Sequence, residues 1–155
     1  MSSIVFFLDR YPNLSETFVS DQITGLLTRG ENIRIVAICG DPGEISAELE
    51  QQFQMSGRVL YLTKHRHPRW NAIFRALTIV RHLGRHDVRQ ALRSDLFGPC
   101  SKKGFLAEIV SNWPTPIRAD VIISHFGTTS VTALALQKLG LLQGRLLPIF
   151  HGYDV

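Results

Sequence analysis

The chain has 155 residues, of which 45% are hydrophobic and 19% are charged, and its formal net charge is +4. A chain of this length and apolar content can form one hydrophobic core, so we expect a single globular domain. No apolar run approaches the roughly 20 residues that a membrane-spanning helix needs, and the two cysteines have neither metal-site nor redox-pair spacing, which favours a reduced, cytoplasmic setting.

The N-terminal half of the chain predicts alternating strands and helices. Residues 4–8 are an apolar run of strand length, and residues 15–19 open a helix that ends near Gly30. Asn13 and Glu16 have the spacing of a capping box at its start. One apolar stripe predicts the buried face of this helix: Val19, Ile23, Leu26 and Leu27. The next predicted strands follow at 33–39 and 58–62, with a turn at 40–43.

The C-terminal half continues this alternation. A helical pattern runs from about residue 68 to 113, with breaks near Gly84 and Gly98. A strand at 120–124 precedes a helix at 128–139, whose predicted inward residues are Val131, Leu134, Ala135 and Leu139. The last strand is expected to start after Pro148, because proline cannot donate to a central ladder. Together these elements predict an α/β fold with a Rossmann-like, mainly parallel sheet and helices on both faces.

Polar residues follow three of the predicted strands. Tyr11 lies in the loop after the first strand, and Ser15, Glu16 and Thr17 begin the helix beyond it. A second group, His125, Phe126 and Gly127, follows the strand at 120–124. The third group closes the last strand: His151, Gly152, Tyr153 and Asp154. Ligands of open α/β sheets bind at the carboxyl ends of the strands, so we expect these groups to border one cleft.

These three groups resemble the N-terminal domain of retaining glycosyltransferases of family 4, which have the GT-B fold, and above all their bacterial exopolysaccharide and colanic-acid branch. That branch has an aromatic-proline loop with Ser-Glu-Thr-Phe-Val, a later His-Phe-Gly turn, and Phe-His-Gly-Tyr-Asp-Val after the next strand. The matching segments are 11–19, 125–127 and 150–155, in the same order. The resemblance implies that residues 1–155 form one Rossmann-like acceptor-binding domain, and that the C-terminal donor-binding domain with its Glu-x7-Glu pair is absent.

The resemblance also implies a reaction, in which a sugar moves from a nucleotide-sugar donor to a saccharide or lipid-linked acceptor. Neither a metal nor another cofactor is expected, because helix N-termini and basic groups balance the leaving diphosphate. His151 is the implied catalytic residue, and residues 152–154 are implied donor contacts. The loop from Tyr11 to Thr17 would approach the acceptor and the donor phosphates, and residues 125–127 would line the acceptor side.

Purely structural roles are the alternatives for the same residues. Ser15 and Thr17 are common residue types at helix starts, and Glu16 fits the capping box alone. His125 and His151 are also explained as hydrogen-bonded histidines at strand ends. Tyr153 and Asp154 would fit the start of an interdomain linker equally well.

Positive charge is concentrated between residues 58 and 103, which include eleven Lys or Arg and two acids. One face of the predicted helix there carries the apolar side chains Trp70, Ile73, Phe74, Leu77 and Val80. Its basic residues lie elsewhere on the helix: Arg69, Arg75 and Arg81. With Trp70 they form a candidate patch for an anionic membrane surface, such as the inner face of the cell membrane. The alternative is a helix that packs its apolar face on the domain.

Two pairs of histidines stand in the same segment. His65 and His67 are two residues apart, and His82 and His86 have the spacing of two metal ligands on one helix face. A zinc site needs three or four ligands, and the glutamate of the metalloprotease helix is missing, so we expect exposed histidines and no metal. No recognised nucleic-acid-binding motif is present, so no nucleic-acid partner is expected.

The sequence therefore supports two hypotheses about function. The favoured one is the acceptor-binding domain of a glycosyltransferase in polysaccharide biosynthesis, inactive without its donor-binding domain or subunit. The alternative is a non-catalytic, membrane-associated module of a polysaccharide assembly complex. A dinucleotide-dependent dehydrogenase does not fit, because no Gly-x-Gly-x-x-Gly follows the first strand.

Overall fold

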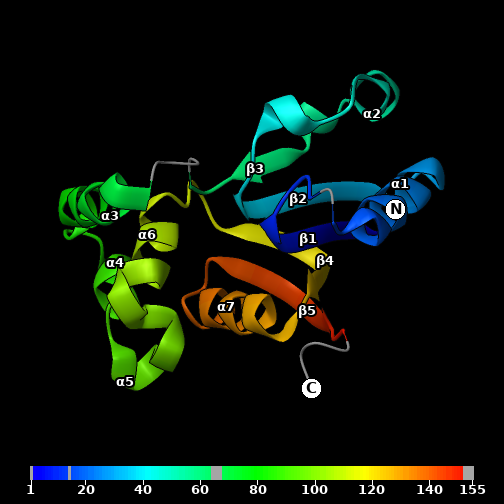
Figure 1. The fold of residues 1–155 in the computed structure, drawn as a ribbon. Helices are drawn as coiled ribbons and strands as arrows, with labels where there is room; N and C mark the ends of the chain where they lie inside the picture. The colour runs from blue at the N-terminus through cyan, green and yellow to red at the C-terminus, as the bar shows by residue number, and fades with distance from the viewer. Residues whose placement is uncertain (1, 14, 64–67, 152–155) are drawn as a thin grey trace.

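The computed structural model describes residues 2–13, 15–63 and 68–151, with side chains described from residue 72 onward in the last segment. Within these residues five strands form one sheet in the order β3-β2-β1-β4-β5 (Figure 1). All neighbouring pairs are parallel. The strands are β1 (Ser3–Arg10), β2 (Asn32–Cys39), β3 (Val59–Tyr61), β4 (Ile117–His125) and β5 (Leu142–Ile149). The predicted Rossmann-like α/β fold is thus confirmed.

Helices connect the strands, and those of residues 68–111 gather in one group beside the sheet (Figure 1). The α-helices are α1 (Thr17–Thr28), α2 (Ala47–Phe53), α3 (Pro68–His82), α4 (His86–Ala91), α5 (Ser94–Phe97), α6 (Phe105–Ser111) and α7 (Gly127–Lys138). Short 3-10 helices are η1 (Pro42–Glu44), η2 (Met55–Gly57) and η3 (Gly98–Gly104). The predicted breaks near Gly84 and Gly98 are confirmed. None of the described helices is both long and apolar enough to cross a membrane.

The sheet separates two hydrophobic cores, because successive side chains of a strand point to opposite faces. Phe6 and Leu8 of β1 pack with the apolar stripe of α1 on one face. Val5 and Phe7 pack on the other face, with residues of α3, α4, α6 and α7. Both faces are therefore covered by helices, as an all-parallel sheet requires.

The start predicted for the last strand is wrong. β5 begins at Leu142 and runs through Pro148, which is paired with Ser124 of β4. The Ile149 carbonyl accepts from the Phe126 N–H at 2.9 Å, so the backbone groups of Ile149 face β4 and those of Pro148 face the open edge. The missing N–H of Pro148 therefore costs no ladder hydrogen bond, because β5 has β4 as its one neighbour among the described strands.

The face predicted for α7 is also wrong in part. Val131 and Leu134 are 51% and 45% exposed, whereas Thr129, Thr132 and Ala133 are buried. The Thr132 hydroxyl donates to the Thr128 carbonyl at 3.2 Å, so this polar side chain can be buried without an unpaired group. Small residues let α7 approach the sheet closely; Leu136 is buried with them, whereas Val131 and Leu134 face outward.

The capping box predicted for α1 does not form. Glu16 is the N-cap residue, and its side chain makes no capping hydrogen bond. The Asn13 side chain instead accepts from the Ser15 backbone and hydroxyl, at 3.3 Å and 2.9 Å. The predicted stop is confirmed: Gly30 has φ +81°, and the Glu31 N–H bonds to the Leu26 carbonyl.

Candidate functional site

Two histidines meet at the carboxyl edge of the sheet, where β4 and β5 end side by side. His125 Nδ1 lies 3.0 Å from His151 Nε2. The two rings are stacked, with centroids 5.3 Å apart and an angle of 16° between their planes. His125 Nε2 lies 3.0 Å from the side-chain oxygen of Gln22 on α1. We call Gln22, His125 and His151 the histidine cluster; it links three elements that are far apart in the sequence.

Aromatic rings enclose the histidine cluster. Phe6 of β1 stacks on His125 at a centroid distance of 6.3 Å. Phe18 of α1 lies 5.7 Å from the His125 ring and 4.8 Å from the His151 ring. Phe126 lies 4.6 Å from His151 on another side. These contacts hold both imidazoles in place; His125 is only 3% exposed, whereas His151 is half-buried.

The turn that carries His125 into α7 has an unusual backbone. Phe126 has φ +69° and ψ +143°, a conformation that costs energy for a residue with a side chain. Hydrogen bonds hold it on both sides: its N–H donates to Ile149, and its carbonyl accepts from the Ser130 N–H and hydroxyl. A Cβ at Gly127 would lie 3.3 Å from the Phe150 ring. Backbone and side chains are thus closely fitted where β4 turns into the helix.

Two carboxyl groups border the same edge. Asp9 reaches solvent on one side, but loss of water around its carboxyl raises its pKa. The pKa of Glu16 is raised by partial burial and then by the charge of Asp9, and the nearby His151 partly offsets these effects. The edge therefore combines two acids and two imidazoles, which are groups that can exchange hydrogen bonds or protons with a polar ligand.

Burial also sets the protonation of His125. Loss of solvent lowers its pKa below 6.5, and the neighbouring His151 lowers it further. His125 is therefore neutral at pH 7 and carries a single ring proton.

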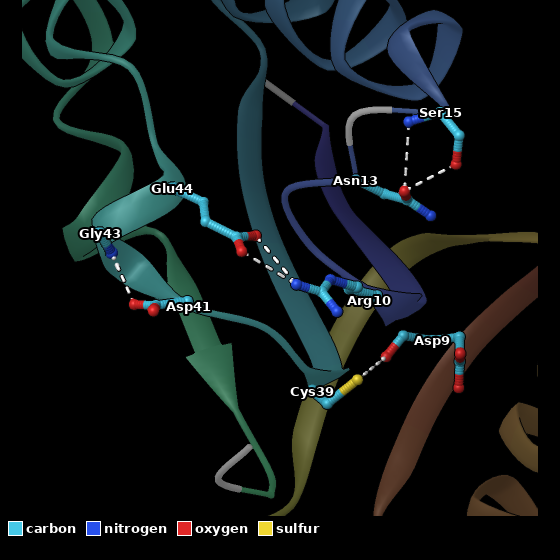
Figure 2. A network of polar contacts seen from close by, with 8 residues as sticks. All are labelled: Asp9, Arg10, Asn13, Ser15, Cys39, Asp41, Gly43 and Glu44. Carbon is cyan, nitrogen blue, oxygen red and sulfur yellow. Dashed lines mark hydrogen bonds and ion pairs between the residues drawn. The ribbon is translucent and has the colours of Figure 1, made fainter. Parts of the chain in front are cut away.

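A network of polar contacts holds the loops after β1 and β2 in place, as Figure 2 shows. The Arg10 guanidinium contacts both carboxylate oxygens of Glu44, at 3.0 and 3.1 Å. The Cys39 thiol lies 3.4 Å from the Asp9 carbonyl. Gly40 passes so close to the loop that a Cβ there would overlap the Tyr11 carbonyl oxygen. These contacts fix the path of the chain toward α1.

The loop residues predicted for ligand binding have different environments. Tyr11 is 1% exposed and packs in the α1 core, where burial raises the pKa of its phenol. Tyr11 thus has a packing role here, and its predicted ligand contact stays a prediction. Ser15 and Thr17 are exposed at the start of α1, and Glu16 is half-buried beside His151.

The basic helix α3 keeps its apolar stripe away from the domain. Ile73, Leu77 and Val80 are 51%, 60% and 63% exposed. Arg75 faces inward instead, and its Nε lies 2.6 Å from the carboxylate of Glu108 on α6. The packing alternative for this stripe is thus not realised, and Arg75 has a partner within the domain.

Several predicted residues lie outside the described part of the chain. These are Gly152, Tyr153, Asp154, His65 and His67, together with the side chains of Arg69 and Trp70. Among the described residues, no group of three or more His, Cys, Asp or Glu side chains is placed to hold a metal ion. The ring of His82 bonds instead to the Thr78 carbonyl.

Sequence reasoning missed Gln22, Phe18 and Asp9. Phe18 and Gln22 are four residues apart on α1, so they share one helix face, and that spacing follows from the sequence once the helix is aimed at the edge. Asp9 stands at the carboxyl end of the first strand, a position typical of functional residues.

Comparison with known proteins adds the family context. The chain is 34% identical over 158 residues to WcaL of Escherichia coli K12, a protein named as a colanic acid biosynthesis glycosyltransferase. The chain resembles exopolysaccharide glycosyltransferases over nearly its whole length. A Salmonella typhimurium protein of the same name is also 34% identical, and the amylovoran biosynthesis glycosyltransferase AmsK of Erwinia amylovora is 28% identical. The predicted resemblance to exopolysaccharide and colanic-acid glycosyltransferases is thus confirmed.

These matches cover 97–98% of the chain but only 37–38% of each relative. No family model and no solved structure matches the chain.

Proposed function

We propose that this chain supplies the acceptor-binding side of a glycosyltransferase that acts in exopolysaccharide biosynthesis. The observation that carries the proposal is the contact between His125 and His151 at the carboxyl edge of the sheet. It involves two of the three segments on which the resemblance to these enzymes was based, and it lies where α/β sheets bind ligands.

In the proposed reaction a sugar moves from a nucleotide-sugar donor to a saccharide or lipid-linked acceptor, with retention at the anomeric carbon. His151 contacts the donor sugar and stabilises charge that develops in the transition state. Phe126 lies beside His151 and, with His125 and with Gly127 at the start of α7, lines the acceptor side. Residues 152–154 are proposed donor contacts. No metal is required in this scheme, because backbone N–H groups at a helix start stabilise anions.

We further propose a GT-B arrangement, in which a donor-binding domain or subunit faces this edge. The length of the relatives leaves room for such a domain, since the chain spans little more than a third of them. Catalysis between two domains needs both walls of the cleft to exclude water and orient the substrates. The 155-residue chain alone is therefore expected to show no sugar transfer.

A transfer assay tests this function. The chain is incubated with labelled nucleotide sugars and saccharide acceptors, alone and joined to a donor-binding domain from a relative. We expect turnover only in the joined protein, and a loss of about 100-fold or more in His151→Ala, with little change in thermal stability. Turnover by the chain alone would contradict the two-domain proposal. Full activity of His151→Ala would contradict the role of His151.

We also propose that α3 brings the domain to an anionic membrane surface at the inner face of the cell membrane. The exposed apolar side chains of Ile73, Leu77 and Val80 lie on a helix within the most basic segment of the chain. Arg81 is exposed on the same helix. Each basic residue near an anionic surface contributes about 1 kcal/mol, and buried apolar side chains add to this. The same surface would serve the alternative function, a non-catalytic module of an assembly complex.

Co-sedimentation with vesicles tests the membrane proposal. The chain should sediment with vesicles rich in anionic phospholipid, less so at high salt, because screening weakens the attraction. Arg81→Glu and Leu77→Ser should each reduce the bound fraction. Arg118→Glu makes the same charge change on β4, outside the basic segment, and should reduce it less. Equal binding to neutral and anionic vesicles, or none to either, would overturn the proposal.

A further inference from the structure

Gln22 is bonded to the histidine that His151 contacts. Its side-chain oxygen lies 3.0 Å from His125 Nε2, and His125 Nδ1 lies 3.0 Å from His151 Nε2. We propose that Gln22 is a positioning residue, which fixes the ring proton of His125 and, through it, the ring proton of His151. Any effect of Gln22 on catalysis rests on the proposed function, whereas the test of the inference does not depend on that function.

The argument follows from counting donors and acceptors. An amide oxygen can only accept, so His125 must donate to Gln22 through Nε2–H. A neutral imidazole has one N–H, so His125 Nδ1 then carries a lone pair. The contact with His151 therefore requires that His151 Nε2 carries a proton and donates it to His125. One amide on α1 thus determines the direction of both hydrogen bonds.

The surroundings of the cluster support a single arrangement. His125 is 3% exposed and stacks on Phe6 at 6.3 Å, so its ring cannot turn without disturbing the core. Phe18 contacts both imidazoles from the same helix as Gln22. Glu16 is a charged group close enough to His151 for the two to influence each other electrostatically. Low exposure also keeps His125 neutral, as the count of protons requires.

The consequence concerns the second nitrogen of His151. In the neutral ring with its proton on Nε2, Nδ1 is an acceptor, so a group that meets Nδ1 has to donate a hydrogen bond. A sugar hydroxyl can do so.

The test measures ring protonation directly, by 15N NMR of histidine-labelled protein with the full 155-residue chain at pH 8. In the wild type, Nε2 should be the protonated nitrogen in both His125 and His151. Gln22→Lys replaces the acceptor by an N–H donor and should move the proton to Nδ1 in both rings. Gln22→Met removes the hydrogen bond to His125. The ratio of His125 protonated on Nε2 to His125 protonated on Nδ1 should then fall about fivefold, the effect of one hydrogen bond.

The control is Gln51→Lys, the same substitution at an exposed position of α2, which should leave both rings unchanged. His151 does not touch Gln22 in the proposed chain of contacts, so a change in its protonated nitrogen is an effect that loss of packing alone would not produce. A wild-type His125 protonated on Nδ1, or a His151 that is unaffected in Gln22→Lys, would overturn the inference. Because no sugar transfer is measured, failure of the proposed function would leave this result intact.

Discussion

At the scale of single residues, His125 illustrates how position in the fold changes an ordinary side chain. It ends β4 at the carboxyl edge, yet both ring nitrogens are hydrogen-bonded and only 3% of its surface is exposed. The burial and the hydrogen bonds of His125 therefore agree with the structural alternative, a hydrogen-bonded histidine at a strand end. Its contact with His151 also links it to the proposed site.

The lowered pKa of His125 predicts a pH effect on stability. The unfolded chain binds a proton below about 6.5, whereas the folded chain binds it only at lower pH. The free energy of unfolding should therefore fall as pH decreases through this window. Denaturant unfolding between pH 5 and 8 measures it, and His125→Phe should show a shallower decline. The raised pKa values of Asp9 and Glu16 change stability with pH in the opposite direction. Because both proteins contain these two acids, their effect cancels in the comparison. Identical slopes would contradict the prediction.

The sequence indicated His125 and His151 because each follows an apolar strand. It gave no comparable sign for Gln22, since a glutamine on a helix is usually a solvated residue and its partner is 103 residues away in the sequence. Tyr11 shows the opposite case: it stands in a loop motif, and the structure buries it in the α1 core, which its sequence position did not indicate. Motif membership does not determine which side of the backbone a residue faces.

At the scale of elements, replacing glycine by alanine should have opposite effects at two sites. One site lies where the chain after β2 passes close to the loop after β1, and the other lies inside α1. Gly40 has φ +152°, and a Cβ there would overlap the Tyr11 carbonyl, so Gly40→Ala should lower stability by more than about 1 kcal/mol. Gly25 lies in α1 with open space around its Cβ position, so Gly25→Ala should raise stability by roughly 0.5–1 kcal/mol. Thermal or urea unfolding measures both, and the same sign for the two variants would be inconsistent with this packing.

The contact between α3 and α6 predicts a second contrast. Glu108 is 8% exposed and is paired with Arg75, so Arg75→Ala leaves a buried carboxylate without its partner. We expect a loss of roughly 3 kcal/mol in the free energy of unfolding. Arg81→Ala, on the exposed side of α3, should change it by less than about 0.5 kcal/mol. Equal losses in the two variants would show that the ion pair does not hold α3 in place.

Most strands could be predicted because their apolar residues must cover both faces of a parallel sheet. The start of β5 could not, because whether proline is tolerated depends on which side of the strand lies at an edge, and strand order is not visible locally. The face of α7 was mistaken for a related reason. Threonine and alanine face the sheet there, and an apolar stripe alone does not identify the side that packs.

At the scale of the whole molecule, the order of the strands explains how distant motifs converge. β1, β4 and β5 are neighbours, so their carboxyl ends bring together the loop after Arg10, the turn at His125 and the ring of His151. The sequence predicted that these motifs share one edge, but it could not supply the contacts between them. Those contacts depend on α1, which crosses over the sheet and places Phe18 and Gln22 beside the imidazoles.

The central proposal, that the edge around His125 and His151 binds the sugars of the transfer reaction, is tested most directly by NMR titration of the labelled chain with exopolysaccharide oligosaccharides. We predict saturable shifts concentrated at Phe18, Gln22, His125 and His151, and their loss in His151→Ala with the fold preserved. Shifts confined to the groove between α3 and η3, around Ile79 and Gly104, or the same shifts in wild type and His151→Ala, would contradict the account.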